Sequence, residues 1–523
     1  MCGAPRFSLT AERSLPPSGG TATLVAAGRL SDGDALAFSA AGLAVSLSNV
    51  LGNSFVIGAA SALDTFCGQA KGAGALRSLG VYLQRALALN LVIVCLLSAL
   101  WAVSVRPLLA SIEGDEALAA SAWHFLALLA PGVFFTGCSE CFRRYLQSQS
   151  IVRGPMWVTL VVALLHVPLT LAVVKAWGGY RGAALALSLS NGLLSLALWA
   201  YIRKQGDPRA WGGWMPREAM SRWPEFLRVA APAAAMILLE WWAFEIAVIF
   251  AGTLPGDAEV NTGASAVLFN VVAIAFMLPY GVSAAAATRV GNALGAGDAE
   301  GARRAALATL ALGGVIVVLV ELVLVLTRHV IAEAFTANAD VAAAVRLCLP
   351  WLCLEIGMDA LQNVTTGALR GQGRQNRGAL VNLCTYYAFA LPLGLLLATR
   401  GGYGLRGLWA GLGGTCGCRS GAGARTARAR VCCGMLQSTD TRTAGVTVQF
   451  LGQASLVWSA DWEMIAMDAR RRVEVEQAAL TSDLLDGPQD ALRGLLEGFA
   501  NGDGVPSAPS AEAAANVGSD TMP

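Results

Sequence analysis

The sequence has little charge and almost no histidine. Only 14% of its 523 residues are Asp, Glu, Lys or Arg, and three are His. A water-soluble domain carries about 25% charged residues, so the composition excludes a stable soluble enzyme. Lys and Arg number 37 against 35 Asp and Glu, which leaves a net charge of +2. That balance provides no basic surface for nucleic acid.

Patterns of catalytic and metal-binding residues are also lacking. The three histidines, His124, His166 and His329, form no H-E-x-x-H motif and no Ser/His/Asp arrangement. Twelve Cys are scattered without regular spacing, mostly in apolar segments, where thiols behave as small hydrophobic groups. No glycine-rich segment is followed by the Lys-Ser/Thr pair of a P-loop. We therefore expect no enzymatic activity, no metal and no cofactor.

Long apolar runs, by contrast, are abundant, and 55% of the residues are hydrophobic. A helix that crosses a bilayer needs about 20 apolar residues. Such runs predict an all-α integral membrane protein. Ten segments meet the length and are bounded by polar or charged turns: Ala35–Leu63, Ala86–Val105, Ala117–Cys138, Met156–Trp177, Gly182–Ile202, Val229–Ala251, Ala264–Ala287, Ala305–Leu326, Val341–Leu369 and Ala379–Ala398.

Basic residues gather in alternate connections between these segments. The intervening connections are short and acidic or neutral, as at Glu113–Glu116. By the positive-inside rule, the basic connections face the cytoplasm. They contain Lys71, Arg77, Arg85, Arg143, Arg144, Arg153, Arg203, Lys204, Arg209, Arg217, Arg222, Arg228, Arg289, Arg303, Arg304, Arg370, Arg374 and Arg377.

An internal repeat indicates two related halves. The pattern T-x-x-G-[QN]-A-x-G-A-G occurs at Thr65–Gly74 and again at Thr288–Gly297, an offset of 223 residues. Gln149 and Gln372 stand at the same offset. We expect both copies to be cytoplasmic loops, so that the halves run parallel, as in some secondary transporters. Chance recurrence in a chain rich in Gly and Ala is the alternative.

Several segments together resemble one family. They are Ala62–Ala70, Leu239–Glu245, Pro279–Gly297, Asp359–Gln375 and Asp461–Arg472. In these segments the chain resembles eukaryotic multidrug and toxic compound extrusion (MATE) transporters. The plant and algal branch is the more similar, because Asn270 stands where animal members have a carboxylate. The resemblance implies two pseudo-repeated six-helix lobes, here with about 11–12 transmembrane helices.

The resemblance also suggests a domain division. We expect a non-matching segment 1–27 in place of a first helix, an N-lobe at 28–204 and an inter-lobe loop at 205–228. A C-lobe follows at 229–460, with its last helix interrupted by an insert at 415–445, and then a largely disordered cytoplasmic tail at 461–523. Within that tail an amphipathic helix is plausible around Glu474–Leu496.

Two carboxylates in apolar segments are the main functional candidates. Glu240 lies in the middle of Val229–Ala251, and Asp359 lies similarly in Val341–Leu369. A charge at the bilayer centre costs about 3 kcal/mol or more, so such a residue is a functional hypothesis by default. A desolvated carboxyl favours its neutral form and can hold either a proton or a cationic substrate. The resemblance implies the same role for both residues, whereas a structural hydrogen bond between helices is the alternative.

Other polar residues accompany this pair. Glu355, Gln362, Asn363 and Thr366 recur around Asp359 at steps of three and four, which places them on one helix face. Glu245 is about 140° around the helix from Glu240, so it is either a neighbour of the site or outside it. Asn270 matches a cavity position of the family but could equally bond a neighbouring helix. Tyr386 could offer a cation–π face or be a core residue. Glu321 we interpret as interfacial, and His166 as a packed helix residue.

These residues predict a secondary antiporter that exports organic cations, xenobiotics or secondary metabolites in exchange for protons. No ATP-binding domain is seen, so an ion gradient is the expected energy source. Sodium coupling is one alternative, and an inactive membrane scaffold derived from the family is another. A lipid-linked flippase is less expected, because its cavity would be basic. We expect a monomer with a cationic or amphipathic substrate, in the plasma membrane or the vacuolar membrane.

Overall fold

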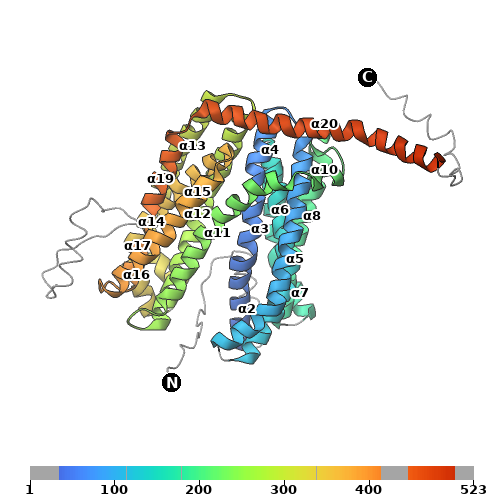
Figure 1. The fold of residues 1–523 in the computed structure, drawn as a ribbon. Coiled ribbons are helices and arrows are strands. Elements are labelled where there is room, and N and C mark those ends of the chain that lie inside the picture. The colour runs from blue at the N-terminus through green and yellow to red at the C-terminus, as the bar shows by residue number, and fades with distance from the viewer. Residues whose placement is uncertain (1–34, 114, 178, 337, 414–445, 501–523) are drawn as a thin grey trace. The chain divides into compact units, whose positions relative to one another are not determined.

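The computed structural model describes residues 35–113, 115–177, 179–336, 338–413 and 446–500. All regular secondary structure in these ranges is helical, and they contain no strand (Figure 1). By its internal contacts the chain divides into two units, Met1–Val473 and Glu474–Pro523. The first unit holds the long apolar helices and the start of α20.

The N-terminal half contains five long helical stretches. The first is broken into pieces by a π-helical turn and by a kink at Ser61. The elements are α2 (Ala35–Ser48), η1 (Asn49–Asn53), α3 (Ser54–Ala60), α4 (Ala62–Gly72), α5 (Ser78–Glu113), α6 (Glu116–Ser148), α7 (Arg153–Trp177) and α8 (Gly179–Gln205).

Two short helices, α9 (Pro208–Trp211) and α10 (Pro216–Met220), lead into the C-terminal half. That half again has five long stretches, the last of them broken by a second π-helical segment, and ends in shorter helices. The elements are α11 (Trp223–Ala251), α12 (Ala258–Gly295), α13 (Ala299–Phe335), α14 (Ala339–Gln372), α15 (Gln375–Leu383), η2 (Cys384–Ala390), α16 (Leu391–Thr399), α17 (Leu405–Gly413), α19 (Val446–Trp458) and α20 (Trp462–Ala500).

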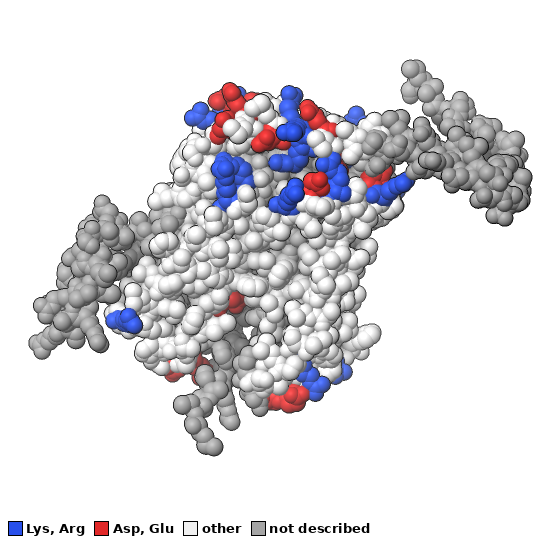
Figure 2. All heavy atoms as spheres, viewed as in Figure 1, with Lys and Arg blue, Asp and Glu red and all other residues white. Residues whose placement is uncertain are grey.

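Ten helical stretches in the described ranges are long and apolar enough to cross a membrane, and they match the ten predicted segments. Most extend beyond the apolar run, because helices continue past the hydrocarbon. Large apolar side chains such as Leu96, Leu164 and Val318 are exposed on their outer faces. Figure 2 shows a broad uncharged belt, with Lys and Arg gathered mainly at one end of the bundle. This basic end, where α4, α6, α8, α12 and α14 finish, carries the connections predicted to be cytoplasmic.

The connections at the opposite end are closed by polar caps. Asp115 accepts hydrogen bonds from the first backbone N–H groups of α6, and Asp257 does the same for α12. Asn338 caps α14 in the same way, with its Oδ1 atom 2.9 Å from the backbone nitrogen of Asp340. A side-chain oxygen at this position satisfies N–H groups that have no partner within the helix. The polar residues of these short connections therefore serve as N-caps of the helices that follow.

The repeated motif was wrongly predicted to be a loop. Thr65–Gly72 belongs to α4 and Thr288–Gly295 belongs to α12. The two copies pack against each other: a Cβ atom placed on Gly68 would lie 3.4 Å from the Cα atom of Gly291. Gly72 packs on the backbone of Asn292, and Gly295 packs on the backbone of Gln69. Because equivalent residues meet, the contact between the halves has approximate two-fold symmetry.

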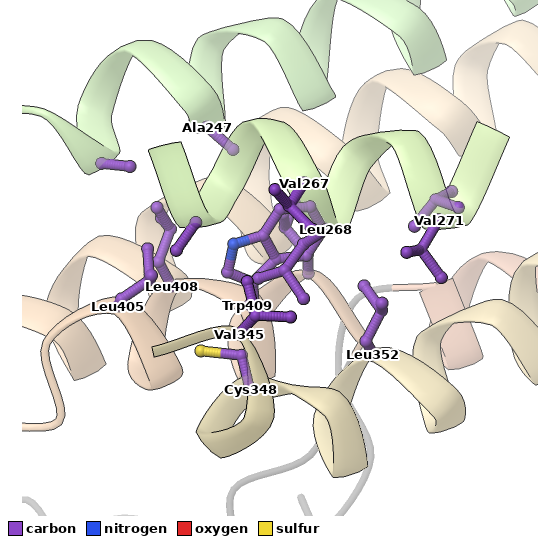
Figure 3. Close-up of a cluster of buried hydrophobic side chains, with 14 of the residues drawn as sticks. Ala247, Val267, Leu268, Val271, Val345, Cys348, Leu352, Leu405, Leu408 and Trp409 are labelled. Atoms are coloured by element: carbon purple, nitrogen blue, oxygen red, sulfur yellow. The ribbon is translucent and has the colours of Figure 1, made fainter. Parts of the chain in front are cut away.

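A hydrophobic core in the C-terminal half surrounds Trp409 of α17. Figure 3 shows its ring between Val267 and Leu268 of α12 and Val345 of α14. The indole nitrogen donates a hydrogen bond to Ser265 Oγ at 3.3 Å. The helix that precedes the predicted insert is therefore an integral part of this half.

The predicted insert at 415–445 lies outside the described residues, as does the segment 1–27. On either side of the insert, α17 and α19 contact each other, and both pack against α14. The two fragments lie along the same side of the C-terminal half (Figure 1). The interruption of a single helix by 415–445 stays a prediction.

The tail is more helical than predicted. The expected amphipathic helix at Glu474–Leu496 is part of α20, which already begins at Trp462. The structure therefore gives residues 462–500 of the tail a helical conformation. Trp462 and Ala466 pack on α12 and α13 in a small core, whereas Arg472 contacts Gln69 of α4. Burial lowers the pKa of Arg472 below its ordinary value. The start of α20 thus touches both halves at the basic end.

Candidate functional site

Two acidic side chains lie inside the C-terminal half. Glu240 of α11 and Asp359 of α14 are 7% and 3% exposed. Glu240 lies within electrostatic range of Asp359 and within hydrogen-bonding reach of Gln362. The Oδ1 atom of Asp359 has no hydrogen-bond partner among the described residues. The structure therefore brings the two predicted carboxylates together from different helices.

Two further side chains complete this acidic cluster. Glu355 and Tyr386 are both 0% exposed. Tyr386, from η2, lies in electrostatic range of Glu240, Asp359 and Glu355. Its hydroxyl lies within hydrogen-bonding reach of Gln449, whereas both carboxylate oxygens of Glu355 have no hydrogen-bond partner in the described part of the chain. Buried polar atoms are nearly always satisfied, so this cluster has the properties of a site that a proton or a ligand completes.

A chain of buried amides adjoins the acidic cluster. Gln362 donates to Thr366 at 2.9 Å, and Thr366 donates to Gln453 of α19 at 2.7 Å. Gln453 and Gln449 both donate to Asn382 Oδ1, at 2.8 and 2.9 Å. Asn382 in turn donates to the backbone oxygen of Met236 in α11. The amides connect α14, α19, α15 and α11 around the carboxylates.

A second group of buried charges joins the two halves at the basic end. Asp64 of α4 accepts a hydrogen bond from Arg144 of α6 and forms an ion pair with Arg370 of α14, whose Nε atom is 3.2 Å from the carboxylate. Arg144 also donates to the hydroxyl of Tyr280 in α12 at 3.0 Å. We call Asp64, Arg144, Arg370 and Tyr280 the inter-half ion cluster. The sequence predicted Arg144 and Arg370 in the connections between helices. In the structure both side chains are buried and belong to helices.

Direct hydrogen bonds strengthen the same junction. Gln69 donates to the backbone oxygen of Gly371 at 3.0 Å, and Gln375 donates to the hydroxyl of Thr65. Nearer the middle of the bundle, the indole of Trp242 donates to the backbone oxygen of Val50 at 3.0 Å. The bonds of Gln69 and Gln375 close the basic end between the two halves, and the Trp242 bond joins the halves nearer the middle.

Comparison with known proteins identifies the family that has this architecture. The family model MatE matches residues 11–172 and 232–396. The chain belongs to the MATE family. The match begins inside the segment 1–27 that the sequence resemblance had left out.

Individual MATE proteins show the same relationship. Protein DETOXIFICATION 16 of Arabidopsis thaliana is 36% identical over 379 residues, which cover 72% of this chain and 77% of that protein. Multidrug and toxin extrusion protein 2 of Mus musculus is 35% identical over 71% of this chain and 64% of its own length. The crystal structure of the eukaryotic MATE transporter AtDTX14 superimposes with a TM-score of 0.76 at 30% identity, over 87% of this chain and 94% of that one. The chain is therefore a multi-pass membrane protein of a transporter family and not an enzyme.

The remaining predicted site residues of this MATE protein lie at different distances from the acidic cluster. Asn363 is buried one turn along α14 from Asp359, and its Oδ1 atom has no partner among the described residues. Glu245 is half-buried on α11, and no described contact joins it to Glu240. Asn270 donates to the backbone oxygen of Ala266 in its own helix, at 2.8 Å, rather than to a neighbouring helix. Their roles stay predictions.

Sequence reasoning also missed or misplaced several residues. Gln449 and Gln453 were not singled out, although their spacing of four residues places both on one helix face. The apparent insert before them hid that pattern. Glu321, which we interpret as interfacial, is half-buried and faces Gly357 and Cys353 of α14, and this packing was not predicted. His166 donates to or accepts from Ser190 Oγ at 2.7 Å, as expected for a packed helix residue.

Proposed function

We propose that this MATE protein is a secondary antiporter that exports organic cations, xenobiotics or secondary metabolites in exchange for protons. The observation that carries the proposal is the buried pairing of Glu240 and Asp359. Burying a charge that has no partner is costly. Two neighbouring carboxyls in a dry site are therefore stable when protonated, or when a cation offsets their charge. The same pair can hold protons or a cationic substrate, but not both.

Neighbouring groups suit a cationic substrate. Tyr386 provides an aromatic surface beside the carboxylates, and cations bind favourably over such faces. Arg370 is the basic residue in electrostatic range of Glu240, and it is already paired with Asp64. The substrate therefore meets an acidic site rather than a neutralised one.

A proton gradient would supply the energy. One pH unit provides about 1.4 kcal/mol per proton, and 100 mV provides about 2.3 kcal/mol per charge moved. Even one exchanged proton therefore supports a substrate gradient of tenfold or more. With the basic end in the cytoplasm, the contacts across the inter-half ion cluster support a state that is closed on the cytoplasmic side. We expect a monomer in the plasma membrane or the vacuolar membrane.

The test is efflux of a fluorescent organic cation from proteoliposomes driven by a pH gradient. We expect transport by the wild type, and a loss of about a hundredfold in Glu240→Gln, because that side chain can no longer exchange a proton. Glu300→Gln is the control, since Glu300 is an exposed carboxylate paired on the surface with Arg304. Equal loss in both variants would contradict the proposal.

The same assay addresses the alternatives. Gln362 and Asn363 each have a side-chain oxygen without a partner among the described residues, and sodium prefers oxygen ligands. Transport driven by a sodium gradient at equal pH would establish sodium coupling instead. A chain lacking 415–445 should be assayed beside the full chain. Transport by neither form would favour the inactive scaffold.

A further inference from the structure

Among the carboxyls of the acidic cluster, Glu355 has no part in the proposed exchange. It lies on α14 four residues from Asp359, about 6 Å along the helix and away from the basic end. Its side chain is fully buried, and neither carboxylate oxygen has a hydrogen-bond partner among the described residues. No hydrogen bond with the described residues therefore accounts for a carboxyl at this position.

The groups that face Glu355 come from four elements. Asp359 lies on the same helix, Glu240 on α11, Glu321 on α13 and Tyr386 on η2. None of these carries positive charge. An ionised carboxylate in such surroundings would be both desolvated and repelled by its neighbours. Glu355 therefore needs a proton or another cation whenever the site is closed as it is here.

Glu321 connects this position to the surface of the bundle. It is half-buried on α13 and reaches α14 at Gly357, where a Cβ atom would lie 3.1 Å from its Oε1 atom. The absence of a side chain at Gly357 leaves the space that the carboxyl occupies. The Oε1 atom has no hydrogen-bond partner in the described part of the chain. Glu321 is thus more accessible than Glu355 and lies within electrostatic range of it.

No group of His, Cys, Asp and Glu in the described residues is arranged to hold a metal ion. The acidic residues are spread over α13, α14 and α11, and Glu321, Glu355 and Asp359 each have an oxygen atom without a hydrogen-bond partner among the described residues. A proton, which needs only one oxygen, fits this arrangement better than a metal ion does.

We propose that Glu355 is a second proton site that is supplied through Glu321, so that the transporter exchanges two protons for each substrate cation. Glu321 takes a proton from water on the side away from the basic end. The proton passes to the carboxylate of Glu355, which becomes neutral, and Glu321 is left ionised until water protonates it again. Glu240 and Asp359 remain the site that exchanges a proton for substrate. This inference rests on the proposed antiport function.

The proton stoichiometry can be measured from the pH gradient that stops net transport. Proteoliposomes are held at zero voltage with potassium and valinomycin and given a tenfold gradient of a fluorescent organic cation. Two exchanged protons balance this gradient at about 0.5 pH unit, and one proton balances it at about 1 unit. We expect the wild type to balance near 0.5, and Glu355→Gln to continue transport but balance near 1.

Control variants separate the possible outcomes. Glu300→Gln should balance near 0.5, like the wild type. Glu355→Met is the second variant if Glu355→Gln does not fold, because apolar side chains of similar volume are tolerated at buried ionic positions. Glu321→Gln should still balance near 0.5 but transport more slowly, since the supply of protons is impaired.

A wild type that balances near 1 would overturn the second proton site while leaving antiport intact. A balance point unchanged by Glu355→Gln or Glu355→Met would place the second proton elsewhere and overturn the assignment. Unaltered speed in Glu321→Gln would remove Glu321 from the path. Failure of any pH gradient to drive the wild type would instead contradict the proposed function itself.

Discussion

At the scale of single residues, two groups of buried charges in the described part of this protein differ in how they are paired. The acidic cluster in the C-terminal half has carboxyl oxygens without partners, whereas the inter-half ion cluster is internally paired. The first arrangement is open to a proton or a cation, and the second holds helices together. Burial alone therefore does not distinguish a binding carboxylate from a structural one. The distinction lies in whether its oxygen atoms already have partners in the protein.

Asp64 should be the most sensitive structural carboxylate. Asp64→Asn would leave Arg370 buried without its counter-charge and Arg144 with only Glu140, whose Oε2 atom is 3.8 Å from its Nε atom, and breaking such a buried pair costs about 3–5 kcal/mol. Glu116→Gln is the matched control, because Glu116 pairs with Arg106 at 2.6 Å on the exposed surface. Such surface pairs contribute about 0–1 kcal/mol. Thermal unfolding in detergent should show a large loss for Asp64→Asn only. Similar unfolding of the two variants would contradict a stabilising role for the ion cluster.

Sequence reasoning at this scale found Glu240 and Asp359 because charge in an apolar run is rare and informative. It did not find the ion cluster, since Arg144 and Arg370 stand beside other arginines and read as loop residues. Asn382, Gln449 and Gln453 escaped notice because uncharged amides barely alter hydropathy. Which of them meet depends on how four helices pack, and a single sequence does not show this.

At the scale of elements, hydropathy predicted the ten candidate spanning helices of the described residues but not where they end. The helices α4 and α12 continue into the polar repeated motif, whose glycines had suggested loops. Those glycines instead let the two helices approach closely at Gly68 and Gly291. Glycine in a helix lowers its intrinsic stability by about 1 kcal/mol relative to alanine, and close packing between the halves offsets that loss.

The close approach predicts opposite effects for two glycine substitutions. In Gly72→Ala, the new methyl group would overlap the backbone of Asn292, so the two halves must separate. In Gly314→Ala on α13, no atom lies within 4 Å of the added carbon. We expect Gly72→Ala to lower efflux at least tenfold and to lower the melting temperature. Gly314→Ala should leave efflux unchanged and stabilise slightly, by up to about 1 kcal/mol.

Melting curves and efflux of both variants, reconstituted at equal density, give the comparison. If Gly72→Ala transports and unfolds like the wild type, then α4 and α12 do not need the close contact seen here.

At the scale of the whole molecule, two related halves meet through equivalent residues of a repeated motif. The contacts at Gly68, Gly72, Gly291 and Gly295 are surrounded by the ion cluster and by hydrogen bonds such as that from Gln69 to Gly371. The acidic cluster lies in only one half. Closure at the basic end and cation exchange inside the C-terminal half are therefore separate parts of the structure.

The sequence repeat predicted two parallel halves, and the resemblance predicted their family. Neither could show that the halves touch through the repeat itself, since that depends on the three-dimensional arrangement of helices separated by more than 200 residues.

The central claim is that one buried carboxyl pair holds either protons or the substrate cation. It is tested most directly by titrating the purified protein with an organic cation in weakly buffered detergent solution containing a pH indicator. We expect binding to release protons from the wild type and from Glu300→Gln, and to release fewer from Glu240→Gln and Asp359→Asn. Substrate binding with no proton release, or with release that is unchanged in both carboxylate variants, would contradict the account.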